Sequence, residues 1–186
     1  MVLSIIWLAF WIYWLVSALR TRSQSKRRES FTSRWLYWIV LAVAYGLLLA
    51  WLPPRYGMLT WRFLPNTVLF VWVGIAITLL GLGFAVWARV HLGQYWSGRV
   101  TIKAGHKLIQ TGPYRIVRHP IYTGILLGLV GSAIAVGEVR ALMAIVLAAV
   151  GIFFKIRVEE KFLLEEFGPA YLQYKKEVKT IIPFVL

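Results

Sequence analysis

The chain has 186 residues, of which 60% are hydrophobic and 16% aromatic, and it contains no cysteine. This composition excludes an ordinary soluble domain, which is about 45–50% apolar, and the missing thiols exclude disulfides, thiolate metal ligands and cysteine nucleophiles. The 21 Lys and Arg outnumber the seven acidic residues, but the long apolar runs favour charge asymmetry across a membrane over nucleic-acid binding.

The apolar residues form blocks of the length that crosses a bilayer, about 20 helical residues. The first block lacks a basic start and a clear cleavage site, so it is expected to be a retained span and not a signal peptide. The last block is too long for one span and is interrupted only around Gly137, which predicts a helical hairpin. The predicted fold class is an all-α integral membrane protein, one domain over residues 1–186, with five transmembrane helices at 2–19, 35–52, 67–88, 121–136 and 139–156.

Basic residues are concentrated in three segments, 20–34, 89–118 and 155–179, which carry six each. Five spans place these segments on one side together with the C-terminus, so that 18 of the 21 basic residues lie there. The positive-inside rule makes this side cytoplasmic and puts the N-terminus outside. The connector 89–120 and the tail 157–183 are therefore expected to be cytoplasmic.

The stretch GPYRIVRHPIYTGILLG, Gly112 to Gly128, places ionisable residues at the start of an apolar helix. Gly112-Pro113 predicts a turn. Pro120 disfavours helical backbone at His119 and itself suits a first helical turn. Irregular backbone near a membrane is tolerated only against protein or a polar cavity, which favours a functional site over a simple interfacial anchor.

The tail after the last span contains paired acidic residues, Glu159 and Glu160. Helical spacing puts Lys155 one turn before Glu159 and Arg157 three residues before Glu160. An exposed helix with ion pairs is one interpretation. The other is a site, because charge at the membrane face is costly and usually functional. Gly168-Pro169 predicts a break before a second short helix.

The segments HKLIQTGPYRIVRHPIYTG and, further along, RVEEKFLLEEFGPAYLQY resemble the isoprenylcysteine carboxyl methyltransferase and phospholipid methyltransferase superfamily. With HLGQYWSG, the resemblance covers roughly residues 90–183. It implies an S-adenosylmethionine-dependent methyltransferase without a Rossmann fold. Its cofactor pocket would lie between the connector, the last hairpin and the C-terminal helices, at the cytoplasmic face.

The resemblance also implies roles for individual residues. The catalytic residues would be Arg157, Glu159 and Glu160, and no metal site is expected. Members often have Arg where this chain has Lys155, so whether Lys155 or Arg157 meets a substrate or cofactor carboxylate stays open. From the resemblance and the chemistry of the ligand, the expected cofactor contacts are His106, Lys107, Leu108, Ile109, Tyr114, Arg118, His119, Pro120, Tyr122, Glu159 and Glu160.

The expected acceptor is lipophilic, a prenylated cysteine or a phospholipid, and would enter from the surrounding membrane lipids. Carboxyl O-methylation of an isoprenylcysteine-like substrate is the first expectation. A carboxylate needs no general base, since it is ionised at neutral pH. The alternative is N-methylation of a phospholipid headgroup amine, which needs a base such as Glu160 or His119. Weaker alternatives are an NADPH-dependent membrane reductase and a non-catalytic lipid-binding protein.

Glycines recur in the third and fourth predicted spans. They indicate either close helix packing through small residues or a groove for an acyl or prenyl tail. The oligomeric state is open on either interpretation. These glycines are Gly74, Gly81, Gly83, Gly124, Gly128 and Gly131.

Overall fold

The computed structural model describes residues 2–20, 25–28, 31–49, 54–96, 101–103 and 108–183, and most of them are helical. The α-helices are α1 (Val2–Arg20), α2 (Phe31–Leu49), α3 (Val68–Leu92), α4 (Pro120–Val136), α5 (Val139–Phe167) and α6 (Pro169–Glu177). Short 3-10 helices are η1 (Pro54–Thr60), η2 (Gly93–Tyr95) and η3 (Gly112–Arg115). Strands β1 (Ser25–Arg28) and β2 (Thr101–Lys103) pair antiparallel.

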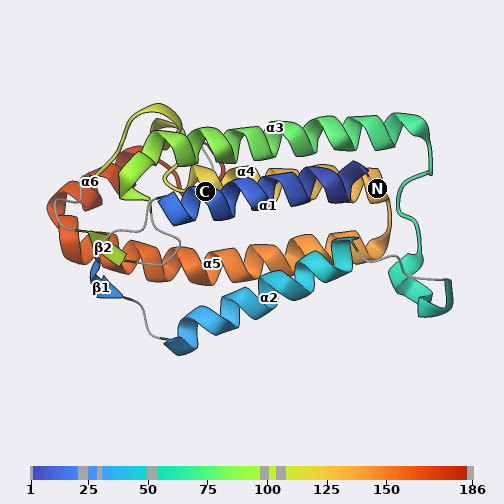
Figure 1. The fold of residues 1–186 in the computed structure, drawn as a ribbon, viewed down its shortest axis with the longest axis horizontal. Helices are drawn as coiled ribbons and strands as arrows, with labels where there is room; N and C mark the ends of the chain where they lie inside the picture. Colours follow the sequence, from blue (N-terminus) through green and yellow to red (C-terminus); the bar gives the residue numbers. More distant parts are fainter. Residues whose placement is uncertain are drawn as a thin grey trace.

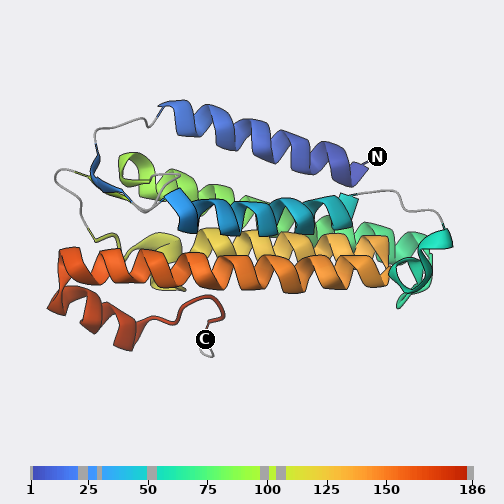
Figure 2. The same cartoon turned by 90° about the horizontal axis from the view of Figure 1, so that it is seen from below.

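The five long helices lie side by side as an elongated bundle (Figure 1). The start of α1, η1 and the turn between α4 and α5 lie at one end of the bundle, and the small sheet and α6 lie at the other. Helix α6 folds back along the last turns of α5 (Figure 2). This arrangement gathers the described parts of the three basic segments at one end.

Three helices within the described residues, α1, α3 and α5, are long and apolar enough to cross a membrane. Helix α4 is apolar but has only 17 residues, and the apolar stretch found in α2 is Ile39–Leu48. The chain is therefore a helical membrane protein with three candidate spans.

Helix boundaries follow several local signals in the sequence. Gly137, with φ 68°, ends α4 in the left-handed region that favours glycine. Helix α5 continues without a break to Phe167, and the turn at Gly168 separates it from α6. The break predicted at Gly168-Pro169 is thus confirmed.

Two local features add to the predicted helical fold. Helix α3 extends beyond the predicted span at 67–88 to Leu92, and near its end the buried Arg89 donates to the carbonyls of Ser17 and Gly93. A small β1–β2 sheet accompanies the predicted helical fold. It pairs two segments far apart in sequence, and β1 is a polar run without the alternation of a half-buried strand.

The closest helix packing joins α3 to α4 through glycines. A Cβ atom built on Gly131 would lie 2.4 Å from the backbone nitrogen of Thr78, and one on Gly124 would lie 2.5 Å from the carbonyl oxygen of Gly81. The two backbones are therefore in contact. At these positions the structure favours the packing interpretation over a groove for a lipid tail.

Buried polar groups connect the remaining helices. The indole nitrogen of Trp7 in α1 donates to the hydroxyl of Ser132 in α4 at 2.9 Å. Arg140 in α5 donates to the carbonyls of Leu47 and Leu48 at 2.7 and 3.0 Å. Because carbonyls at a helix C-terminus lack partners within the helix, Arg140 both satisfies the end of α2 and joins it to α5.

The α3–α4 contact leads to a first prediction. Gly131→Ala should destabilise the protein by about 1–3 kcal/mol, the scale of overpacking, because its new methyl group meets backbone atoms. Gly83→Ala is the matched control, since nothing lies within 4 Å of a Cβ atom there. Thermal unfolding in detergent micelles measures both changes. Equal stability of the two variants would contradict the close packing.

Candidate functional site

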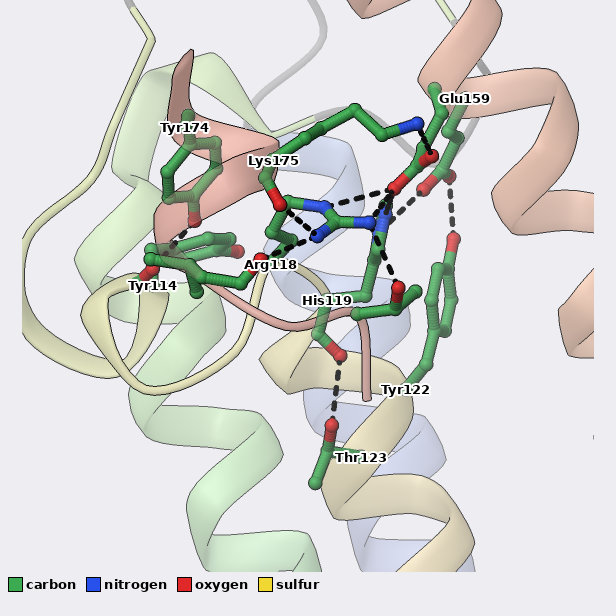
Figure 3. Close-up of polar contacts among 11 residues, drawn as sticks. Tyr114, Arg118, His119, Tyr122, Thr123, Glu159, Tyr174 and Lys175 are labelled. Carbon is green, nitrogen blue, oxygen red and sulfur yellow. Dashed lines mark hydrogen bonds and ion pairs between the residues drawn. The ribbon is translucent and has the colours of Figure 1, made fainter. Parts of the chain in front are cut away.

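The segment before α4 meets the C-terminal part of α5, which the sequence predicts to be cytoplasmic, at the basic end of the bundle. Arg118 and His119 lie between η3 and α4, and Glu159 and Glu160 lie on α5. Figure 3 shows Arg118, His119 and Glu159 pointing toward one another, and Arg118 and His119 also contact Glu160. His119 has φ −122° and ψ 60°, a non-helical backbone, as the following Pro120 predicts.

The guanidinium N–H groups of Arg118 all donate to acceptors within the chain. Its Nε and Nη2 atoms donate to Oε1 of Glu160 at 3.0 and 2.7 Å, and Nη2 also donates to the Thr180 hydroxyl at 2.8 Å. Its Nη1 atom donates to the carbonyls of Val178 and, at 3.4 Å, Lys175. A guanidinium has five N–H donors, and these contacts match all five. The residue is 9% exposed.

His119 lies between the two glutamates. Its Nδ1 atom is 3.6 Å from Oε2 of Glu159, and its Nε2 atom is 3.4 Å from Oε1 of Glu160. Burial alone would lower the pKa of His119, but the two carboxylates together raise it above the ordinary value of 6.5. His119 therefore keeps its proton to a higher pH than an exposed histidine does.

Glu159 has further partners in Tyr122 and Lys155. The Tyr122 hydroxyl donates to Oε1 of Glu159 at 2.5 Å, and the Tyr122 ring stacks on His119 with centroids 5.8 Å apart. The Lys155 ammonium is 3.6 Å from the same oxygen, and Lys155 is 9% exposed. The carboxylate of Glu159 is thus held by groups from α4 and from its own helix.

The cluster carries more cations than carboxylates. Lys175 of α6 donates to Oε2 of Glu160 at 2.7 Å. Arg118, Lys155 and Lys175 therefore surround Glu159 and Glu160, and His119 adds a further positive charge whenever it is protonated. The arrangement is suited to a ligand that brings negative charge, and its carboxylates are suited to an ammonium.

Not every predicted residue joins the cluster. Arg157 is exposed, and its guanidinium lies 4.5 Å above the ring of Phe153. Residues two apart on a helix face different directions, so Lys155 and not Arg157 lies beside the glutamates. The catalytic role expected of Arg157 stays a prediction that the geometry does not support.

The remaining predicted contacts that the structure describes lie around η3. Tyr114 is buried and its carbonyl accepts from the Tyr174 hydroxyl at 2.5 Å. Pro120 is buried at the start of α4, and Leu108 and Ile109 are partly buried. His106 and Lys107 lie outside the described residues.

Sequence reasoning missed Lys175, Thr180 and Tyr174, which all come from α6 or the segment after it. The three-residue spacing of Tyr171 and Tyr174, which puts both on one face of α6, was the available signal. Lys175 and Thr180 had none, because lysines are common in this tail and Thr180 stands in a short apolar run.

The raised pKa of His119 predicts a pH-dependent stability. Protonated His119 stabilises the folded chain fully below pH 6.5, and this contribution is lost as the pH rises through its higher folded-state pKa. The stability advantage of the native chain over His119→Gln should therefore be larger at about pH 6 than at about pH 9. Thermal unfolding measures it, with the exposed His91→Gln as control. If the stability difference between the native chain and His119→Gln did not change with pH, this would contradict the raised pKa of His119.

Residues 72–165, half of the chain, match the model of the isoprenylcysteine carboxyl methyltransferase (ICMT) family. The chain is 32% identical over 117 residues to a probable protein-S-isoprenylcysteine O-methyltransferase of Oryza sativa, over 61% of each chain. It is 32% identical over 116 residues to the protein-S-isoprenylcysteine O-methyltransferase of Saccharomyces cerevisiae, over 61% of this chain and 48% of that one. The matches thus cover less than two thirds of these relatives' length.

The fold also has a solved counterpart, the eukaryotic intramembrane Ras methyltransferase ICMT. The two superpose with a TM-score of 0.58 and 25% sequence identity, over 81% of this chain and 53% of the other. The family match spans most of α3, the Arg118-His119-Pro120 segment, all of α4, and Glu159 and Glu160 of α5. On this match, the chain belongs to the isoprenylcysteine carboxyl methyltransferase family.

Proposed function

We propose that the chain transfers a methyl group from S-adenosylmethionine to a lipophilic acceptor, by carboxyl O-methylation of an isoprenylcysteine-like substrate. One observation carries this proposal. The buried Arg118 and His119 form a single charge cluster with the partly buried Glu159 and Glu160 at the end of an apolar bundle. Membership of the methyltransferase family supports it.

The side chains of the cluster fit this methyl donor, which has an ammonium, a carboxylate, a sulfonium and an adenine. When bound, it supplies an electrophilic methyl group. Glu159 and Glu160 are acceptors suited to the ammonium, and Lys155 or Lys175 suits the carboxylate. The ring of Tyr122 is suited to a cation or to stacking on a flat base.

The chain's own groups act mainly by positioning. A displacement at a methyl group is accelerated by holding the reacting groups in line. Tyr122, Lys155 and His119 hold the carboxylate of Glu159 from three sides. A carboxylate held in this way loses little freedom when a ligand binds, so its position is already set before the reaction.

The charges favour a carboxylate acceptor over an amine. An amine must lose a proton before it attacks, and a nearby carboxylate would have to take it. Glu160 is paired with Arg118 and Lys175, and Glu159 with Lys155. Carboxylates stabilised by cations are weak bases. An acceptor carboxylate needs no base, and a buried cation such as Lys155 would attract it.

The site would lie at the cytoplasmic face, with the N-terminus outside. This topology makes α2 and α4 the second and fourth of five spans, with α4 and α5 as a hairpin. It is supported by the gathering of basic residues at the end of the bundle that holds the cluster (Figure 2). The acceptor would enter laterally from the lipid, with its polar end reaching the cluster.

The direct test supplies methyl-labelled S-adenosylmethionine to the purified protein in liposomes that contain phosphatidylethanolamine and a prenylated cysteine with an unblocked carboxyl group. We expect base-labile methyl esters of the prenylated cysteine. Label in methylated phosphatidylethanolamine would instead indicate N-methylation. No transfer, together with binding of NADPH, would indicate the reductase.

Variants of two neighbouring cations, Lys155 and Arg157, make this test more specific. Lys155→Gln should lower kcat/KM for the acceptor by about 10- to 100-fold, because removing a charged hydrogen-bonding partner costs about 1.5–3 kcal/mol. Arg157→Gln is the matched control on the same helix, and its exposed side chain predicts activity close to that of the native chain. The reverse order of effects would restore Arg157 as the residue that meets the carboxylate.

A further inference from the structure

The chain segment that follows α6, Val178–Ile181, crosses directly over the start of α4. The backbone N–H groups of Arg118 and His119 donate to the carbonyls of Lys179 and Thr180 at 2.8 and 3.0 Å. The hydroxyl of Thr123, one turn into α4, donates to the carbonyl of Ile181 at 2.8 Å. The segment is thus bound to the site by its backbone.

The same segment holds the side chain of Arg118. The Thr180 hydroxyl accepts from Nη2 at 2.8 Å, and the Val178 carbonyl accepts from Nη1. The opposite edge of the guanidinium donates twice to Oε1 of Glu160. Since all five donors of Arg118 already have acceptors within the chain, Arg118 connects the segment to Glu160 and has none left over for a ligand.

Helix α6 gives this segment a fixed starting point. Tyr171 and Tyr174 are 1% and 3% exposed, and the Tyr174 hydroxyl donates to the carbonyl of Tyr114 at 2.5 Å. Val178 follows directly after α6, with its N–H donating to the Tyr174 carbonyl at 3.0 Å. The acceptors offered to Arg118 are therefore held from both sides, by α6 and by Thr123.

We propose that Thr180 is a positioning residue of the site. Its hydroxyl fixes the rotation of the Arg118 guanidinium, and Arg118 in turn fixes the carboxylate of Glu160 toward the methyl donor. The inference rests on the proposed function, because it takes Glu160 as a group that binds the donor. It adds to the site a residue outside the range 72–165 that matches the family model.

The test measures the dissociation constant of S-adenosylhomocysteine by calorimetric titration of the full-length protein in detergent. Thr180→Val removes the hydroxyl and keeps the shape of the side chain. We expect binding about 3- to 10-fold weaker, the equivalent of one hydrogen bond, a raised KM for the methyl donor and a nearly unchanged kcat. Thr180→Ser restores the hydroxyl and should bind as the native chain does.

Ile182→Ala is the matched control, since Ile182 is 48% exposed just beyond the segment. Thr123→Val, which loosens the segment at Ile181, gives a second variant if Thr180→Val folds poorly, and it should also weaken binding. Native affinity in the folded Thr180→Val and Thr123→Val variants, with only a lower melting temperature, would overturn the inference alone. Failure of the native chain to bind would overturn the proposed function and the inference with it.

Discussion

Placing two carboxylates side by side in a partly buried cluster is the constraint on which the rest of the site depends. An ion taken out of water without a partner costs several kcal/mol, and two like charges on adjacent residues repel each other as well. Glu159 and Glu160 are compatible with folding because the segment before α4, α4 itself, α5 and α6 each bring a donor to them. Removing one partner would leave a buried charge uncompensated, so the cluster acts as a unit.

The fold brings these donors together through a few backbone constraints. Pro120 starts α4 directly after the non-helical His119, which directs the imidazole toward α5. Gly137 allows the chain to turn at once into α5, so that α4 and α5 run antiparallel and their ends meet again at the cluster. The glycine contact between α3 and α4 gives α4 a close-packed support along its length. A rigid support of this kind preserves the geometry of a site whose chemistry depends on positioning.

The sequence predicts those parts of the molecule that depend on local backbone chemistry. The turn at Gly137, the break at Gly168 and the irregular backbone at His119 all follow from glycine and proline, and the pairing of Glu159 with Lys155 follows from helical spacing. The partners of Arg118 could not be predicted in this way, because tertiary packing brings Thr180 to it from the far end of the chain. The choice between Lys155 and Arg157 depends on the rotation of α5 about its axis, which only packing determines.

We propose that the paired glutamates Glu159 and Glu160 bind the methyl donor. The most direct measurement compares S-adenosylhomocysteine binding to the native chain and to Glu160→Gln, with the exposed Glu165→Gln as control. We expect Glu160→Gln to weaken binding by about 1.5–3 kcal/mol, the scale of a lost hydrogen bond to a charged group, and Glu165→Gln to bind as the native chain does. Equal affinity in all three, with Glu160→Gln correctly folded, would contradict it.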